Sequence, residues 1–265
     1  MNQSSVEKKL QEHFSHKSFL EKTRIFVLYH VEKIFLLVLI FVAIILFFFI
    51  RSAISEFYKM PSLKATKVTE KYSFSPQNIR SFAISKKPVS AAEFLDFVHK
   101  SGYIPNIRKT GKAVFHNSKE NKLEFLPISK ELRLSAVAPV TFVNYLDAVN
   151  FCNWKSKQDG LTPVYKILKD DFVEINPSAE GYRLPTAEEW EYAAIKNKSI
   201  LEFGVSEWTS SVYESDVDSL NCICRIIKGH NVFEKSSGKL AGYFSYSDEL
   251  YPVDTIGFRI VKSGD

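Results

Sequence analysis

The feature that most constrains this chain is a run of 17 residues without a polar side chain, from Ile34 to Ile50. As a helix this run is about 26 Å long, close to the ~30 Å hydrocarbon core of a bilayer. The flanking Lys33 and Arg51 can keep their stems in the apolar layer and extend their charges toward the headgroups. A buried core helix is the alternative, but a helix that is apolar on every side and lies at one end of a chain fits that role poorly. We therefore predict one transmembrane helix over residues 34–54.

The residues on either side of this run predict its type and its orientation. A cleavable signal peptide has a short basic region before its apolar core, whereas 33 residues precede this one, so we expect an uncleaved anchor. No cysteine lies near the run, which excludes a lipid-anchored lipoprotein. Basic residues favour the cytoplasmic side. More of them precede the run (Lys8, Lys9, Lys17, Lys22, Arg24 and Lys33) than lie in the 20 residues after it (Arg51, Lys59, Lys64 and Lys67).

The expected organisation follows from this bias. Residues 1–33 form a cytoplasmic tail, residues 55–79 a linker and residues 80–265 an extracytoplasmic domain of a single-pass protein of the inner (cytoplasmic) membrane. The net charge of +5 is small and no block of lysine and arginine stands out, so nucleic acid is not an expected partner. Short helical and strand-like patterns alternate through the large segment, which predicts an α+β domain.

Three helices are predicted from their start signals. Ser90 and Glu93 form a capping box, and Gly102 ends the first helix in the left-handed conformation. Its expected apolar face consists of Phe94, Leu95 and Val98. Asn144 caps the second helix, which stops at Gly160 and buries a stripe of Tyr145, Ala148, Val149 and Cys152.

The third helix begins after a proline. Arg183 and Leu184 end a short strand, and Pro185 stops it because proline has no N–H to donate. Thr186 and Glu189 then form a second capping box. The face of this helix that turns toward the domain carries Trp190, Ala193 and Ala194.

Five segments resemble, in the same order, the formylglycine-generating enzyme (sulfatase-modifying factor) family, whose fold is similar to that of C-type lectin domains. They are KKPVSAAEFLDFV from Lys86, PVTFVNYLDAVNFCNW from Pro139, GYRLPTAEEWEYAA from Gly181, VSEWTSSVY from Val205, and RIIKGHNVF from Arg225 together with TIGFRIV from Thr255. The resemblance covers about residues 80 to 262. It implies an irregular α+β domain with short helices and small antiparallel sheets.

The chemistry that this resemblance implies is incomplete in the chain. Oxidative members of the family hold copper(I) with a pair of cysteines and convert a substrate cysteine into formylglycine. The corresponding stretch here, Glu234 to Leu250, contains serines and no cysteine, and a hydroxyl cannot replace a thiolate on copper(I). The double glycine usual in the family is Gly229-His230 here. The resemblance therefore favours a pseudoenzyme over an active oxidase.

The other chemistry-bearing residues leave alternatives open. Cys222 and Cys224 would share one face of a strand, as small buried side chains, as partners in a disulfide that could include Cys152, or as a displaced copper site. Calcium is a weaker alternative, because the nearest acidic pair is Asp216 and Asp218. The segment Glu207-Trp208-Thr209 is interpreted as structural: a buried tryptophan, and a threonine bonded to a turn.

Two functions are therefore weighed. The first is a non-catalytic, membrane-anchored module without a cofactor that binds or scaffolds another membrane or envelope protein, or a glycan. Its binding surface would lie between His230 and Tyr251, where aromatic side chains are dense. The candidates are His230, Phe233, Tyr243, Phe244, Tyr246 and Tyr251. The alternative is a copper-dependent formylglycine-generating oxidoreductase that acts on a sulfatase cysteine and uses Cys222 and Cys224.

Overall fold

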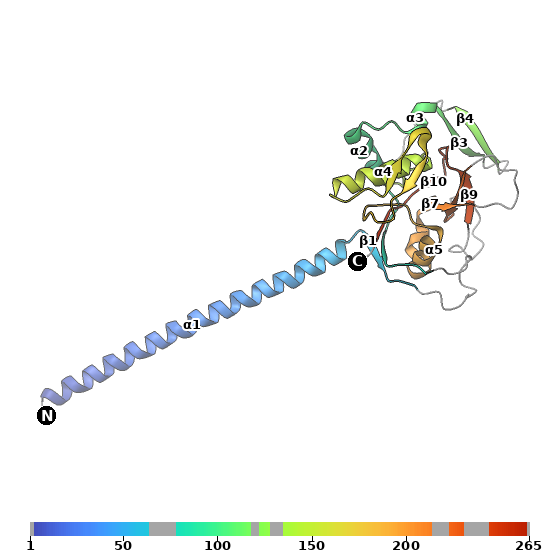
Figure 1. Cartoon of the computed structure of the whole chain (residues 1–265). Coiled ribbons are helices and arrows are strands. Elements are labelled where there is room, and N and C mark those ends of the chain that lie inside the picture. Colours follow the sequence, from blue (N-terminus) through green and yellow to red (C-terminus); the bar gives the residue numbers. More distant parts are fainter. Residues whose placement is uncertain are drawn as a thin grey trace. The chain divides into compact units, whose positions relative to one another are not determined.

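The structure, a computed structural model, describes residues 3–63, 78–117, 122–127, 135–213, 223–230 and 244–263. The chain divides into two compact units, residues 1–55 and 56–265. The first unit is a single helix and the second holds the remaining elements (Figure 1).

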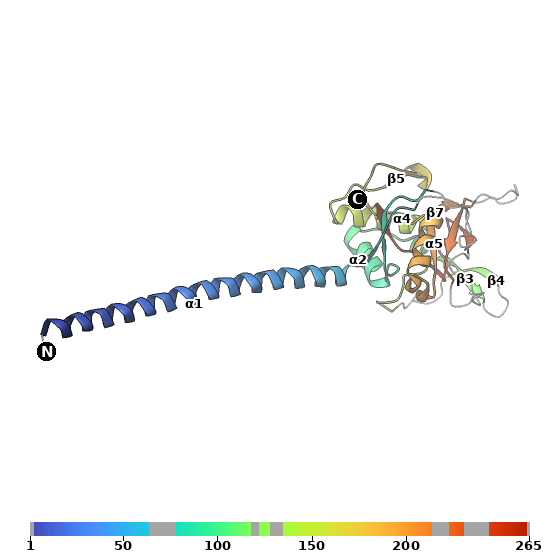
Figure 2. The ribbon, with the colours of Figure 1, turned by 90° about the horizontal axis from the view of Figure 1, so that it is seen from below.

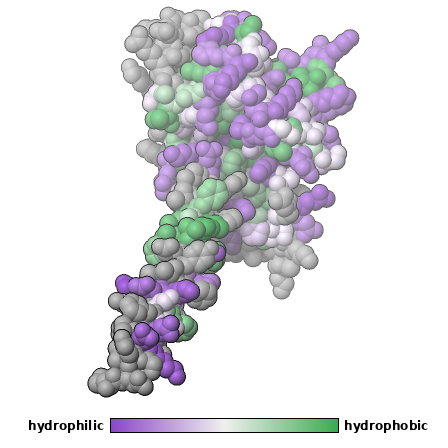
Figure 3. All heavy atoms as spheres, turned by 90° about the vertical axis from the view of Figure 1, so that its left-hand side faces the viewer, coloured by the Kyte–Doolittle hydropathy of each residue, from purple (hydrophilic) through white to green (hydrophobic). Residues whose placement is uncertain are grey.

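The first unit is helix α1, Gln3–Ile54. The exposed fractions of its large apolar side chains between Ile34 and Phe47 range from 43% to 66%. Figure 3 shows these residues as one hydrophobic band, with hydrophilic residues nearer the N-terminus. Among the residues whose side chains the structure describes, no helical stretch is both long and apolar enough to cross a membrane.

Two sheets form the centre of the second unit. In one, strands β1 (Phe57–Met60), β2 (Phe82–Ser85) and β11 (Val261–Ser263) pair antiparallel in the order β1-β2-β11. The other has the order β10-β7-β8-β9, from β7 (Ser206–Val212), β8 (Cys224–Lys228), β9 (Phe244–Asp248) and β10 (Ile256–Gly257). The prediction of small antiparallel sheets is confirmed except for the pair β7–β10, which is parallel.

Two short hairpins complete the strands. β3 (Lys112–Asn117) pairs with β4 (Lys122–Pro127), and β5 (Tyr165–Ile167) pairs with β6 (Val173–Ile175). The turn of the second hairpin contains the short 3-10 helix η1, Lys169–Asp171. Asp170 and Asp171 both have positive φ there, a conformation that aspartate tolerates better than most residues.

The helices confirm the predicted start signals. α2 (Ala91–Ser101), α4 (Tyr145–Gln158) and α5 (Ala187–Lys196) each begin with a capping box, at Ser90, Asn144 and Thr186. A third box at Asn144 was not foreseen, because its reciprocal partner is Asp147 rather than Glu or Gln. The shorter helices are α3 (Asn106–Thr110) and the 3-10 helix η2 (Lys198–Phe203). In both views of the fold, α5 lies beside β7 (Figures 1 and 2).

Three sequence predictions differ from the structure. Residues 57–60, assigned to the linker, form a strand of the domain, and Met60 is buried in the core. Leu95 is 46% exposed, because α2 turns Phe94, Phe97 and Val98 inward instead. Arg183 forms an isolated antiparallel bridge with Val261 rather than the end of a strand.

The core has two parts. The larger lies around α2, α4, Trp208 and Phe258, and includes the predicted stripe of α4. The smaller lies between α5 and the sheet β1-β2-β11, and there Trp190, Ala193 and Ala194 are buried as expected. The segment that contains Arg183 joins the two parts, since Leu184 belongs to the first and the α5 face to the second.

Candidate functional site

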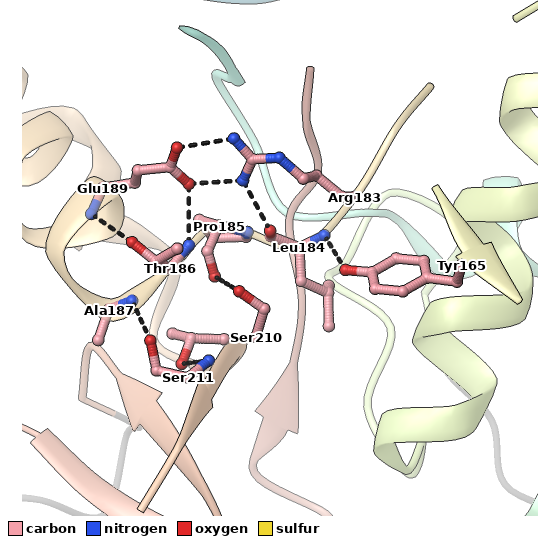
Figure 4. Close-up of polar contacts among 10 residues, drawn as sticks. Tyr165, Arg183, Leu184, Pro185, Thr186, Ala187, Glu189, Ser210 and Ser211 are labelled. Atoms are coloured by element: carbon pink, nitrogen blue, oxygen red, sulfur yellow. Dashed lines mark hydrogen bonds and ion pairs between the residues drawn. The ribbon is translucent and has the colours of Figure 1, made fainter. Parts of the chain in front are cut away.

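The segment GYRLPTAEEWEYAA forms a tightly bonded connection that leads into α5 (Figure 4). Nη1 and Nη2 of Arg183 donate to the two carboxylate oxygens of Glu189 at 2.6 and 2.7 Å. One of these oxygens also accepts from the Thr186 backbone N–H at 2.9 Å. The hydroxyl of Tyr165 accepts from the Leu184 N–H at 2.9 Å. Glu189 therefore caps a helix and binds an arginine, and neither role leaves it as a free acid or base.

A second buried carboxylate lies behind this turn. Glu207 on β7 is 1% exposed and accepts from Trp190 Nε1 of α5 at 2.7 Å. Its two oxygens also accept from Nε and Nη2 of Arg259, with a distance of 2.6 Å for the Nη2 bond. The same Nη2 donates to the Ile200 carbonyl at 3.1 Å. This network joins α5, β7, η2 and the segment before β11, so Glu207 holds elements together.

A third buried ion pair joins β8 to α5. Lys228 Nζ lies 2.9 Å from a carboxylate oxygen of Glu191, and both side chains are fully buried. Burial lowers the pKa of Lys228, and the attraction of Glu191 opposes that shift. The residue after Lys228, Gly229, has φ +81°, and a side chain there would lie 3.2 Å from the ring of Trp190. The glycine is thus required by both its backbone angle and its close contact.

The segment Glu207-Trp208-Thr209 is structural, as interpreted. Trp208 is fully buried and its Nε1 donates to the Val143 carbonyl at 3.0 Å. The Thr209 hydroxyl donates to the Ile226 carbonyl at 2.6 Å. The same hydroxyl accepts from the Ser211 N–H at 3.3 Å, so Thr209 bonds both to the neighbouring strand β8 and to its own local backbone.

A further buried carboxylate was not singled out from the sequence. Asp147 on α4 is fully buried and accepts from the Tyr103 hydroxyl at 2.8 Å and from the Asn106 N–H at 3.0 Å. Burial raises the pKa of Asp147, and these donors oppose the rise. The pKa of Tyr103 is raised by its burial and by the Asp147 charge. Asp147 lies three residues after the cap Asn144, and this spacing is the sequence signal that could have identified it.

The cysteines do not form a described metal site. Cys152 is a free, fully buried thiol whose pKa is raised by burial, so the alternative of a Cys152 disulfide is wrong. Cys224 is disulfide-bonded and 3% exposed, and Cys222 lies outside the described residues. A disulfide sulfur is not the thiolate that copper(I) needs. The described parts of the chain contain no cluster of three His, Cys, Asp or Glu residues that could hold a metal ion. Asp216 and Asp218 are not among the described residues.

Four of the six predicted surface residues can be placed. Phe244 and Tyr246 lie on β9 and are 39% and 44% exposed, and Tyr251, in the turn beyond it, is 42% exposed. His230 follows the end of β8, and its buried Nδ1 has no hydrogen-bond partner among the residues that the structure describes. Phe233 and Tyr243 lie outside the described residues.

Sequence reasoning missed one member of this surface. The ring of Tyr213, just after β7, stacks on the ring of Tyr246, with 4.1 Å between ring centroids and 9° between ring planes. The two residues are 33 positions apart in the chain, so no local pattern relates them. The described residues form an exposed aromatic surface on and beside β9, and no three His, Cys, Asp or Glu residues among them cluster as metal ligands.

Comparison with known proteins identifies similar chains. Residues 62–204 match the family model described as the sulfatase-modifying factor enzyme 1-like domain. A protein of Paenibacillus barcinonensis named chaperone protein LppX is 41% identical over 70 residues, which is 21% of this chain and 25% of that protein. The chain therefore spans about a quarter of the length of the curated relative it matches.

Solved structures share the fold. CarF has a TM-score of 0.56 at 21% identity, over 79% of this chain and 98% of that chain. Variable protein 1 of Treponema denticola has a TM-score of 0.52 at 16% identity, over 78% and 95%. PvdO from Pseudomonas aeruginosa has a TM-score of 0.50 at 15% identity, over 78% and 94%. At these identities the likeness concerns the fold alone.

Proposed function

Since the chain belongs to the sulfatase-modifying factor enzyme family, we propose that it is a membrane-anchored, non-catalytic member that binds another protein outside the cytoplasm. This proposal rests on what the residues of the family-like segments do in the structure. Arg183, Glu189, Glu207 and Arg259 are all engaged in bonds that hold the fold. The stretch that would supply copper ligands, residues 234–250, has no cysteine.

The anchor rests on α1. The apolar run from Ile34 to Ile50 is continuous, and its described large side chains are exposed around the helix. Side chains of this kind require an apolar surrounding, and a bilayer supplies one of about the right thickness. The bias of basic residues toward the N-terminal side supports a cytoplasmic tail and an outer domain.

A protein is a better-supported partner than a glycan. The curated relative is named a chaperone protein, and a chaperone acts on another protein. The exposed side chains of Phe244, Tyr246 and Tyr251 are of the type that is enriched in protein interfaces. The relative matches over 70 residues only, so the analogy extends no further than the class of partner.

Copper binding tests the non-catalytic part of the proposal. The full chain, reduced and held in nanodiscs, is titrated with copper(I) beside the variants Cys222→Ser and Cys152→Ala. We expect no stoichiometric complex in any of them and no oxidation of a cysteine-containing peptide. A one-to-one complex that Cys222→Ser abolishes and Cys152→Ala retains, together with peptide oxidation, would establish the copper-dependent oxidase instead.

Membrane extraction tests the anchor. The expressed chain is expected to stay with the membrane pellet at alkaline pH, whereas a peripheral protein is released. Protease added to the outer face of sealed membranes should remove residues 56–265, and inside-out vesicles should protect them. Release by alkali, or digestion from the cytoplasmic face, would refute the anchor or its orientation.

A further inference from the structure

The connection between α1 and the first strand of the domain is very short. Only Ser55 and Glu56 separate α1 from β1, and two extended residues span at most ~7 Å. The apolar run ends at Ile50, and the helical residues that follow it rise by about 6 Å. The headgroup layer on one side of a bilayer is about 5–8 Å thick. With the apolar run in a bilayer, β1 therefore begins at or just beyond the level of the headgroups.

Two lysines project from one face of the sheet that contains β1. Lys59 on β1 and Lys262 on β11 are both cross-strand partners of Ala83 on β2. Side chains directly opposite one another in a sheet share a face, so these two lysines point to the same side, about 10 Å apart. Phe57 points to this face as well, because side chains two positions apart in a strand do so. Lys59 is exposed and Lys262 is half-buried.

The end of α4 adds a third lysine to this face. The ring of Tyr182 stacks on the ring of Phe57 with 5.9 Å between centroids, and Lys155 Nζ lies 5.5 Å from the centroid of the Tyr182 ring. Lys155 Nζ also lies 2.9 Å from a carboxylate oxygen of Asp159. Although burial raises the pKa of Asp159, its hydrogen bonds and the charges of Lys155 and Lys262 lower it overall. The charges of both lysines therefore reach the same carboxylate.

Two further lysines follow β2. The Lys86 N–H donates to the Glu56 carbonyl at 2.7 Å, which holds Lys86 and Lys87 beside the start of β1. Lys86 Nζ lies 5.5 Å from the centroid of the Tyr58 ring, and Lys87 is exposed. These lysines therefore lie next to the residues that connect the domain to α1.

Together these residues form what we call the β1 lysine cluster: Lys59, Lys86, Lys87, Lys155 and Lys262. The described contacts place two carboxylates among them, Glu56 and Asp159, so positive charge is in excess. A lysine ammonium is a compact, hydrated charge that attracts phosphate without a fixed geometry. Lysines beside a membrane anchor are attracted in this way to acidic lipids.

We propose that the β1 lysine cluster lies against the anionic phospholipid headgroups of the membrane that holds α1. The inference rests on the proposed anchor and specifies which face of the domain is turned to the bilayer. The two-residue connection brings a membrane surface beside the cluster, and the sign of the charge selects acidic over neutral lipids.

The test measures how fast each lysine is acetylated. The full chain is placed in nanodiscs of phosphatidylcholine alone, or with about a third of anionic phosphatidylglycerol. An uncharged N-hydroxysuccinimide ester of acetate modifies the lysines, and mass spectrometry gives the rate at each position. Lys109 is the matched control for Lys155, because its Nζ also lies 5.5 Å from a tyrosine ring centroid, that of Tyr103, toward the other end of α4. Lys166, whose side chain is 71% exposed, is a second control.

We expect phosphatidylglycerol to slow acetylation of Lys59, Lys87 and Lys262 about fivefold, and to leave both controls unchanged. About 1 M salt should restore the rates, because the screening length falls to ~3 Å. The double variant Lys59→Gln with Lys262→Gln should also release Lys87 from protection. The double variant Lys109→Gln with Lys166→Gln should not. The comparison of lipids needs no variant, so it decides the matter even if a variant fails to fold.

Equal rates in the two lipids, or a protection that salt does not reverse, would overturn the inference. Protection that extends to Lys109 and Lys166 would also overturn it, because the effect would then be general to the disc. Soluble glycerophosphate that protects the cluster in phosphatidylcholine discs would indicate a site for free phosphate instead of a membrane-facing surface. A chain that does not stay with the nanodiscs refutes the anchor itself, whereas equal rates in a retained chain refute only the lipid contact.

Discussion

The buried pair Lys228–Glu191 gives the most direct test of how this domain is held together. Lys228 on β8 and Glu191 on α5 lie 2.9 Å apart, with both side chains fully buried. Removing one partner takes away the opposite charge that lies 2.9 Å from the other, and breaking a buried pair in this way costs about 3–5 kcal/mol. We therefore expect Lys228→Met and Glu191→Gln each to lower the free energy of unfolding by that amount.

Removing both charges should be far less costly. A buried ion pair replaced by apolar residues of similar volume is often neutral in stability, so Lys228→Met with Glu191→Leu should lie within about 2 kcal/mol of the wild type. The coupling energy, obtained from a double-mutant cycle, should thus be several kcal/mol. The exposed pair Lys166–Glu174, 3.4 Å apart, is the control and should couple by less than about 1 kcal/mol.

Urea unfolding followed by tryptophan fluorescence measures these values. The three tryptophans, Trp154, Trp190 and Trp208, all lie in the second unit, so the signal reports on the domain even in the full chain. Equal costs for the double variant and the sum of the singles would refute the argument. It would mean that water or another group compensates each charge separately.

Three further predictions concern caps, packing and pH. Thr186→Ala removes the hydroxyl that accepts from the Glu189 N–H at 3.1 Å and should cost about 1 kcal/mol in urea unfolding, with Thr186→Ser as the control. Gly257→Ala places a Cβ 2.5 Å from the Val140 carbonyl oxygen, a backbone atom, and should lower the melting temperature by an overpacking cost of about 1–3 kcal/mol. Burial raises the pKa of Tyr145 to about 12, above the value of about 10 in the unfolded chain. The contribution of Tyr145 to the free energy of unfolding is therefore complete below pH ~10 and is lost as the pH rises through 12. Tyr145→Phe should thus flatten the decline in stability at alkaline pH. An unchanged slope of stability against pH would contradict this.

Several predictions made from the sequence depend on neighbours in the chain, and these were reliable. The capping boxes at Ser90 and Thr186 formed as expected, because a cap and its reciprocal partner are three residues apart. The left-handed Gly102 and the buried stripe of α4 followed from the same local geometry. The family also followed from short, ordered segments, and the match over residues 62–204 confirms it.

Predictions that depend on distant residues were less complete. The sequence did not indicate that Arg259 would bind Glu207, 52 positions earlier, or that residues 57–60 would join β2. It also assigned Leu95 to the core, although Phe97 fills that place. In each case the decision depends on which surface the rest of the domain presents to the segment.

The sequence by itself determined where α2, α4 and α5 begin, that its signature segment belongs to a known family, and that a copper-binding cysteine pair is missing from residues 234–250. These properties reside in residue types and in spacings of a few positions. Only the tertiary structure decided that the signature's charged residues bind one another, and that the rings of Tyr213 and Tyr246 stack. Burial and strand register join residues far apart in the chain, and register alone sets whether an N–H points into the sheet or out of it.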